Sequence, residues 1–332
     1  RLNMFVMGLD IGYSNLKIVS GYVNQAPMSV EVLPVGAAPI EKMSGNIRGE
    51  VVSGERVWVD GKEYVAGVEP DELAGWERVL HEDYPASIEY RALLYAALMR
   101  SQRAKIDLLV TGLPVDHFLL GNQKRVKDLK RQLRGVHQIT PEHAVMIGEV
   151  EVVPQPLGSY LDVVVASGAE DSFAATELLV IDPGFFSVDW LYMSGTSINH
   201  AVSGSSTHAT SEILEQANKI LVDRYSFRVG VKKLERCIRT GQKHLRIPGA
   251  DQVAISDLLA EAAASVGPSS LTQLRSKLRS VDKDVQAIIL SGGAASLYRA
   301  AVEEVFPRAE IIVPKESVTA NAQGFWYYGA ES

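Results

Sequence analysis

The fold of this chain is decided by the stretch Gly8–Lys17, which reads GLDIGYSNLK. Apolar runs lie on both sides of its turn, from Met4 to Leu9 before it and from Leu16 to Val19 after it. Two such runs joined by a short connection that contains glycine predict a β-hairpin. An Asp-x-Gly turn is common in hairpins, so this stretch taken alone says little about function.

The same pattern returns about half a chain later, in the stretch Ile181–Asp189, which reads IDPGFFSVD. The two stretches pair Asp10 with Asp182, Gly12 with Gly184, Tyr13 with Phe185, Asn15 with Ser187 and Leu16 with Val188. The second copy also has a strand pattern on each side, Glu177–Ile181 and Val188–Tyr192. An internal repeat of this length predicts two similar α/β domains that face each other across a cleft. A ligand in that cleft would meet both Asp-x-Gly turns.

The rest of the chain fits this plan. A hairpin is expected over Val57–Val65, about the turn Asp60-Gly61. Apolar spacing predicts helices and strands in the following order: helix Ser87–Met99, strand Lys105–Thr111, helix Asn122–Leu133, strand Gly148–Val153, helices Thr207–Tyr225, Ser256–Val266 and Leu271–Leu278, strand Val285–Ser291 and closing helix Val318–Trp326. We expect a first domain over residues 1–153, a second over 154–317, and a closing segment, 318–332, that packs back on the first.

Composition and charge exclude several classes of protein. The chain has 332 residues, 46% of them hydrophobic, which is typical of a globular protein rather than a disordered one. No apolar run reaches the length of a membrane span, so no membrane partner is expected. The single cysteine, Cys237, allows no internal disulfide, and the first residues lack the pattern of a signal peptide; both favour the cytoplasm. The net charge of −7 argues against electrostatic binding of nucleic acid by the protein as a whole.

The first turn has the chemistry of a phosphate-binding site. A glycine turn leaves backbone N–H groups that point outward and bind phosphate oxygens; here they would come from Gly12, Tyr13, Ser14 and Asn15. Lys17 would offer a positive charge to the same phosphates. Asp10 would hold water molecules of a bridging Mg²⁺ ion.

A second glycine-rich turn, Ser291-Gly292-Gly293-Ala294-Ala295, follows an apolar run and opens a helical stretch. Such a turn from strand to helix lies against a nucleoside or phosphate in many proteins. It is also a common plain turn.

These motifs, in this order, resemble those of the actin-like ATPases, and within them the ParM/StbA plasmid-segregation family. The superfamily also contains heat-shock chaperones and sugar kinases, and its domains are ribonuclease H-like. The resemblance rests on the first phosphate motif at Gly8–Lys17, a Thr-Gly-Leu-Pro segment at Val110–Pro114, a connecting segment at Val153–Gly158, the second phosphate motif at Ile181–Gly184, the adenosine motif at Leu290–Ala294 and a closing helix at Ala320–Gly324. It therefore covers most of the chain.

The resemblance implies ATP with Mg²⁺ as cofactors. Asp10 and Asp182 would hold the metal through water, and Gln155 would orient the hydrolytic water; these three would be the catalytic residues. Because glutamine is a poor base, hydrolysis would be slow. The nucleotide would be bound by Gly12, Tyr13, Ser14, Asn15, Lys17, Gly184, Phe185, Phe186, Ser187, Gly204, Lys232, Glu235, Gly292, Gly293 and Ala294. Lys232 and Glu235 fit a solvated helix face equally well.

One departure from the family pattern concerns hydrolysis. Phe185 and Phe186 stand where many relatives have small or hydroxylated residues. Their side chains would narrow the phosphate side of the cleft unless they turn into the core. Pro183 stiffens the same turn.

By resemblance, the function is that of an ATPase that polymerises head to tail into filaments and positions plasmid DNA through a DNA-binding adaptor. Its partners would be further copies of itself and the adaptor, with DNA contacted only indirectly. Two alternatives stay open: a nucleotide-binding scaffold with little hydrolysis, and a small-molecule kinase of the same superfamily. A chaperone of the same superfamily is not expected.

Overall fold

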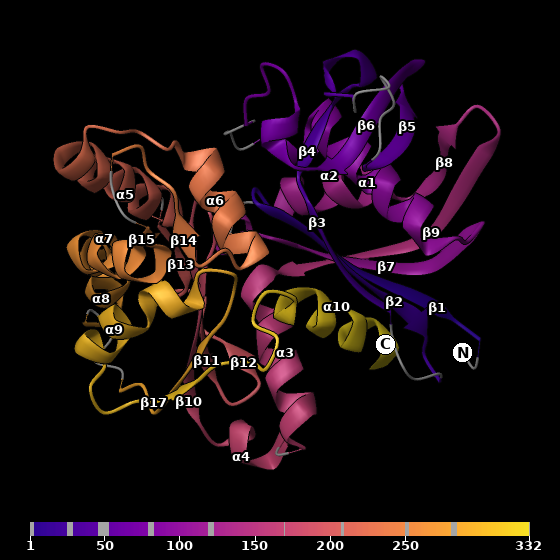
Figure 1. The fold of residues 1–332 in the computed structure, drawn as a ribbon. Helices are drawn as coiled ribbons and strands as arrows, with labels where there is room; N and C mark the ends of the chain where they lie inside the picture. Colours follow the sequence, from indigo (N-terminus) through magenta and orange to yellow (C-terminus); the bar gives the residue numbers. More distant parts are fainter. Residues whose placement is uncertain are drawn as a thin grey trace. The chain divides into compact units, whose positions relative to one another are not determined.

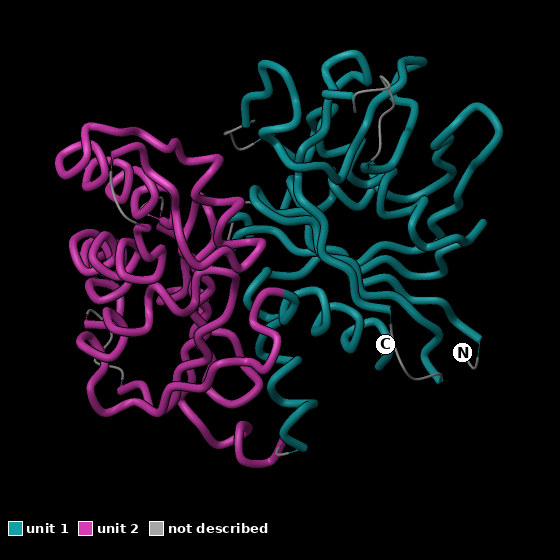
Figure 2. Tube along the Cα trace, in the orientation of Figure 1, with its two compact units in different colours: residues 1–168, 319–332 teal, residues 169–318 magenta. Residues whose placement is uncertain are grey.

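A computed structural model describes residues 3–24, 29–45, 53–78, 83–118, 123–168, 170–206, 209–249, 252–279 and 284–331. The chain forms two compact units (Figure 2). Unit 1 comprises Arg1–Gly168 and Thr319–Ser332, and unit 2 comprises Ala169–Val318.

Unit 1 is built on a mixed sheet with the strand order β3-β2-β1-β7-β9-β8 (Figure 1). Its strands are β1 (Phe5–Ile11), β2 (Asn15–Tyr22), β3 (Ser29–Pro34), β7 (Lys105–Leu113), β8 (Gly135–Thr140) and β9 (His143–Pro154). The β1–β2 hairpin is antiparallel, whereas β1, β7 and β9 run parallel. The first predicted hairpin is therefore confirmed. The strand expected at Gly148–Val153 is longer than expected, because β9 also pairs with β8 at its beginning.

A smaller sheet in unit 1 has the order β4-β6-β5. Its strands are β4 (Gly36–Pro39), β5 (Glu55–Val59) and β6 (Lys62–Val68). Asp60 and Gly61 join β5 to β6 with positive φ angles of 51° and 77°, as a tight hairpin turn requires. The hairpin predicted about these two residues is confirmed.

Helices cover both faces of the large sheet of unit 1. They are α1 (Ile88–Ser101), α2 (Gln123–Leu133), α3 (Gln155–Ser167) and α10 (Ala320–Glu331). Alternate residues of β1 point to opposite faces: Met7 and Leu9 join the core that includes α1, whereas Val6 packs with Phe325 and Trp326 of α10. Asp10 is in phase with Val6, so it lies on the face that carries α10.

The two compact units divide at Gly168, whereas the sequence predicted a domain boundary after Val153. Unit 1 continues to Gly168, because α3 packs on α10, β7 and β9. The two helices approach closely where Gly158 of α3 meets Gly324 of α10. A Cβ at Gly158 would lie 2.8 Å from Phe325 Cε1, and a Cβ at Gly324 would overlap the backbone of Gly158.

Unit 2 repeats the strand pairing of unit 1. Its sheet has the order β12-β11-β10-β16-β17, with β13 paired to β11. The strands are β10 (Glu177–Pro183), β11 (Val188–Ser194), β12 (Ser197–Ile198), β13 (Gly204–Ser206), β16 (Ala287–Leu290) and β17 (Glu310–Ile312). An antiparallel hairpin again stands beside parallel strands, here β10, β16 and β17. The predicted fold class, with two similar α/β domains, is thus confirmed.

The helices of unit 2 are α4 (Glu170–Ala174), α5 (Thr210–Tyr225), α6 (Val231–Thr240), α7 (Ile255–Ser270), α8 (Thr272–Arg279) and α9 (Ala295–Val305). Between α6 and α7, the short strands β14 (His244–Leu245) and β15 (Val253–Ala254) pair with each other in an antiparallel ribbon. The expected helix starts at Asn122 and Thr207 lie outside the described residues. Among the residues that are described, no helix combines the length and apolar character needed to cross a bilayer.

Candidate functional site

The two repeated hairpins close with the same backbone hydrogen bond. Gly12 N–H donates to Asn15 O at 3.1 Å in unit 1, and Gly184 N–H donates to Ser187 O at 2.8 Å in unit 2. In each hairpin, an aspartate stands two residues before the glycine, near the end of the first strand. The sequence repeat therefore corresponds to a repeated local geometry.

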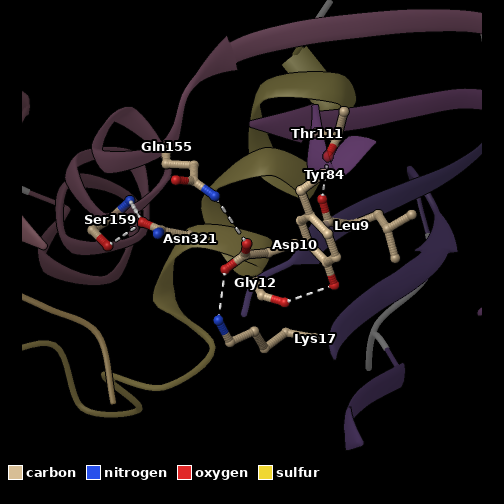
Figure 3. A network of polar contacts seen from close by, with 9 residues as sticks. All are labelled: Leu9, Asp10, Gly12, Lys17, Tyr84, Thr111, Gln155, Ser159 and Asn321. Carbon is tan, nitrogen blue, oxygen red and sulfur yellow. Dashed lines mark hydrogen bonds and ion pairs between the residues drawn. The ribbon is translucent and has the colours of Figure 1, made fainter. Parts of the chain in front are cut away.

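A polar cluster surrounds Asp10 in unit 1 (Figure 3). The Asp10 side chain is only 4% exposed, and its Oδ2 lies 2.9 Å from Lys17 Nζ. Its Oδ1 accepts a hydrogen bond of 3.4 Å from Gln155 Nε2. Lys17 Nζ also lies 3.3 Å from the position that a Cβ of Gly12 would take, so the ammonium group stands beside the turn. The structure thus brings together the predicted Asp10, Gly12, Lys17 and Gln155.

Helix α3 begins at Gln155, and this position brings the Gln155 side chain to Asp10. Strand β9 ends at Pro154, which precedes the helix without a side-chain cap. A Cβ at Gly112 would lie 2.6 Å from Gln155 Cγ and 2.6 Å from Phe325 Cζ, so the absence of a side chain at Gly112 makes room for both. Gly112, the glycine of the Thr-Gly-Leu-Pro segment, therefore leaves the space that the Gln155 side chain occupies beside Asp10.

Side-chain hydroxyls fix the end of β1. Thr111 Oγ1 donates to Leu9 O at 2.7 Å, and Tyr84 OH donates to Gly12 O at 3.3 Å (Figure 3). The rings of Tyr13 and Tyr84 stack with centroids 4.7 Å apart. Sequence reasoning missed Tyr84, because its spacing from the turn carries no local signal.

A second hydrogen-bonded group holds α3 to α10 on the same face. Asn321 Oδ1 accepts from Ser159 Oγ at 2.6 Å and from Ser159 N–H at 3.2 Å, and both residues are buried. Asn321 lies in the predicted closing-helix motif. Its amide thus anchors α10 beside the start of the helix that carries Gln155.

In unit 2, the predicted adenosine motif lies beside the predicted second phosphate motif. Ser291 N–H donates to Ile181 O at 2.9 Å, which extends the β16–β10 ladder as far as the turn. Gly292 has a φ of 83°, and a Cβ there would collide with Asp182 Oδ1. Glycine is therefore required where this turn passes the carboxylate. Gly293 and Ala294 follow it and lead directly into α9.

Sequence reasoning also missed Asp189, which pairs with Asp182 in the β10–β11 register. Asp189 is 3% exposed, and its carboxylate accepts hydrogen bonds from Ser187 Oγ, at 2.7 Å, and from Ser205 Oγ of β13. The sequence repeat could have indicated Asp189, because that residue occupies in the second copy the position that Lys17 occupies in the first. Gly204, a predicted binding residue, is buried in β13 opposite Trp190.

The aromatic pair after the second glycine is half-buried. The rings of Phe185 and Phe186 lie 5.6 Å apart, and Phe185 packs against the hydrophobic core of unit 2. Phe185 therefore turns toward the core. The N-terminus of α5 holds this turn, since Ser211 N–H donates to Phe185 O at 3.0 Å.

The expected base contacts lie on α6. Glu235 is buried and pairs with Arg239 on the same helix, with 3.7 Å between Oε1 and Nη1. Lys232 is exposed on that helix. A role for either in binding the base stays a prediction.

The donor set fits a magnesium nucleotide better than a metal bound by protein alone. Within the described part of the chain, no group of three or more His, Cys, Asp or Glu side chains could hold a metal ion. Mg²⁺ typically keeps several waters and takes one or two carboxylates plus substrate phosphates. Asp10 in unit 1 and Asp182 in unit 2 each carry a buried carboxylate two residues before the glycine of their own turn.

Comparison with known proteins shows what the first part of the chain is similar to. Residues 8–158 match the family model described as Actin like proteins N terminal domain. A sequence comparison with curated proteins gives no match.

Solved structures extend the likeness along the whole chain. The native structure of Ta0583, an archaeal actin homolog, is 22% identical, with 99% of this chain and 100% of that chain covered and a TM-score of 0.78. Its complex with ADP is 20% identical at the same coverage, with a TM-score of 0.76. ParM from a 15-stranded filament of Clostridium botulinum is 18% identical, with 99% and 100% covered and a TM-score of 0.72.

The fold of the chain is similar to that of actin-like proteins. Residues 8–158 match the model of an actin-like N-terminal domain, and the fold of the whole chain is similar to the folds of the archaeal actin homolog and ParM. The resemblance indicated by the sequence motifs is thereby confirmed.

Proposed function

We propose that this chain binds ATP with Mg²⁺ through its two hairpin turns, hydrolyses it slowly, and polymerises into filaments. The observation that carries the proposal is the repeated turn, in which Asp10 with Gly12 and Asp182 with Gly184 share one backbone geometry. The ADP complex of the archaeal actin homolog supports a nucleotide as the ligand.

Each residue has a role that follows from its contacts. Lys17, beside the Gly12 turn, neutralises phosphate oxygens that the turn N–H groups bind. Asp10 and Asp182 accept hydrogen bonds from the water shell of the metal. Bound Mg²⁺ would supply charge neutralisation at the phosphates.

Gln155 positions the attacking water in this proposal. Its Nε2 donates to Asp10 Oδ1, which leaves its Oε1 to accept a proton of a water molecule. An amide cannot take that proton away, so Gln155 orients the nucleophile without activating it. Hydrolysis is then slow, which suits a timer for filament turnover.

The filament is supported by the likeness to ParM in a filament from Clostridium botulinum. A contact between different surfaces of two copies leads to an open polymer rather than a closed dimer. We propose that the polymer positions plasmid DNA in the cytoplasm through a DNA-binding adaptor, as the resemblance to the plasmid-segregation family implies.

Right-angle light scattering with simultaneous phosphate release, on purified protein with Mg·ATP, tests the proposal. We expect scattering to rise above a critical protein concentration, with phosphate release following it. Asp182→Ala should abolish phosphate release, whereas Asp223→Ala, an exposed aspartate of α5, should keep it.

The alternatives give different results in the same assay. Nucleotide binding without scattering or phosphate release would show a nucleotide-binding scaffold, and the turn at Phe185 and Phe186 would then be the first place to examine. ATP consumption only in the presence of a small-molecule acceptor would show a kinase.

A further inference from the structure

The Tyr84 side chain contacts the Gly12 turn from outside the hairpin. Tyr84 lies in a short 3₁₀ turn, Tyr84–Ala86, just before α1, and its OH donates to Gly12 O at 3.3 Å. Its ring is 7% exposed, stacks on Tyr13 and meets the ring of Tyr90 edge-on at 5.4 Å. Burial raises the pKa of the Tyr84 phenol well above its usual range, so the hydroxyl keeps its proton and stays a donor.

This hydrogen bond sets the direction of a neighbouring N–H group. A peptide unit is planar and trans, so its C=O and N–H point in opposite directions. With Gly12 O held toward Tyr84, the N–H of Tyr13 must point away from Tyr84. Tyr13 N–H is one of the turn donors that would bind phosphate.

Unit 2 anchors its equivalent turn in another way. Gly184 O accepts from Thr210 N–H at 3.4 Å, and Phe185 O accepts from Ser211 N–H, both at the start of α5. Backbone groups therefore hold the second turn, whereas a phenol holds the first. A substitution at Tyr84 can therefore remove this contact from the first turn, with the second turn as an internal reference.

We propose that Tyr84 is a positioning residue of the nucleotide site: its hydroxyl orients the Gly12–Tyr13 peptide so that Tyr13 N–H faces the phosphates of a bound nucleoside diphosphate. This inference rests on the proposed nucleotide binding. The ring of Tyr13 itself stacks on the ring of Tyr84, and the Thr111 hydroxyl fixes Leu9 O three residues earlier.

The test compares full-length wild type with Tyr84→Phe, which removes the hydroxyl and keeps the stacked ring. Tyr95→Phe is the matched control, because Tyr95 is a buried tyrosine of α1 whose ring meets His137 instead of the turn. Calorimetry with Mg·ADP should show an affinity about fivefold weaker in Tyr84→Phe, as expected for one net hydrogen bond, and unchanged in Tyr95→Phe.

Amide hydrogen exchange with and without Mg·ADP gives the specific readout. In the wild type, ADP should protect peptides covering residues 9–17 and 181–189. Tyr84→Phe should lose protection at 9–17 and keep it at 181–189, whereas a general loss of stability would reduce both.

Wild-type affinity and protection in Tyr84→Phe would overturn the inference and leave nucleotide binding intact. Equal loss of protection at both turns would also overturn it. If the wild type itself binds no ADP, the proposed function fails and the inference with it.

Discussion

Lys17 and Asp10 face each other across the β1–β2 hairpin and form an ion pair, with 2.9 Å between Nζ and Oδ2. At the equivalent place in unit 2, the register partner of Asp182 is Asp189, so two carboxylates take the positions of a charge pair. The first hairpin therefore carries its own cation, whereas the carboxylate of Asp189 in the second hairpin accepts hydrogen bonds from the Ser187 and Ser205 hydroxyls. The two copies of the repeat share the backbone turn but differ in the charge of the residue opposite the aspartate, Lys17 in the first copy and Asp189 in the second.

Removing the cation at the first turn should weaken nucleotide binding. In Lys17→Met, we expect the affinity for Mg·ADP to fall at least about tenfold, because a charge-assisted contact to phosphate is lost and the buried Asp10 carboxylate loses its ion pair. Calorimetry measures this change. Lys62→Met, at an exposed lysine of β6, is the control and should bind as the wild type does. Equal affinities of the Lys17 variant and the wild type would remove Lys17 from the site.

Gln155 should affect hydrolysis more than binding. In Gln155→Ala, phosphate release should fall about a hundredfold, whereas ADP affinity should stay within about twofold, because the amide meets the water rather than the ground-state nucleotide. Single-turnover phosphate release and calorimetry measure the two effects. Gln132→Ala, at an α2 glutamine that donates to Pro85 O, should change neither. A parallel loss of binding would instead make Gln155 a binding residue.

The close approach of α3 and α10 should make Gly158 essential for stability. A Cβ there would lie 2.7 Å from Asn321 Cα and 2.8 Å from Phe325 Cε1, so Gly158→Ala must separate the helices. We expect the free energy of unfolding to fall by about 3 kcal/mol, as measured by urea denaturation. Gly267→Ala in α7 is the control, because its Cβ would make an ordinary contact of 3.4 Å with Ala301 Cβ. A Gly158 variant as stable as this control would contradict the packing.

Asp162 in α3 should make stability depend on pH. It is 7% exposed, and burial raises the pKa of its carboxyl from 3.8 to about 6. A pKa that is higher in the folded state than in the unfolded chain favours folding at low pH, and this contribution is lost as the pH rises from about 4 to about 6. Asp162→Asn should therefore be more stable than the wild type at pH 7.5 by about 1 kcal/mol.

That difference should shrink as the pH is lowered to 4.5. Thermal unfolding of the wild type and Asp162→Asn across this range measures it. Asp171→Asn, in α4, serves as the exposed control and should show no such trend. A constant difference at all pH values would rule out titration of Asp162 as the cause.

The local elements of this chain could be read from its sequence because their signals are local. The alternation of apolar residues at Met4–Leu9 and Leu16–Val19, with glycine between them, predicted the first hairpin, and β1 and β2 confirm it. The repeat at Ile181–Asp189 predicted the second hairpin, and the matching strand orders of the two units confirm the fold class. The compact units divide at Gly168 rather than at the predicted boundary after Val153, because nothing in the sequence of α3 indicates that its partner is α10.

By itself, then, the sequence determined the two turns, their aspartates and the class of fold, since period-two alternation and glycine turns act between neighbours in the chain. Only the tertiary structure decided which distant groups meet those turns. Tyr84 contacts Gly12 across 72 residues, Gln155 contacts Asp10 across 145, and Ser159 contacts Asn321 across 162. Such contacts depend on how helices pack on a sheet, and this packing is set by shape complementarity over many residues at once, for which no short motif carries a signal.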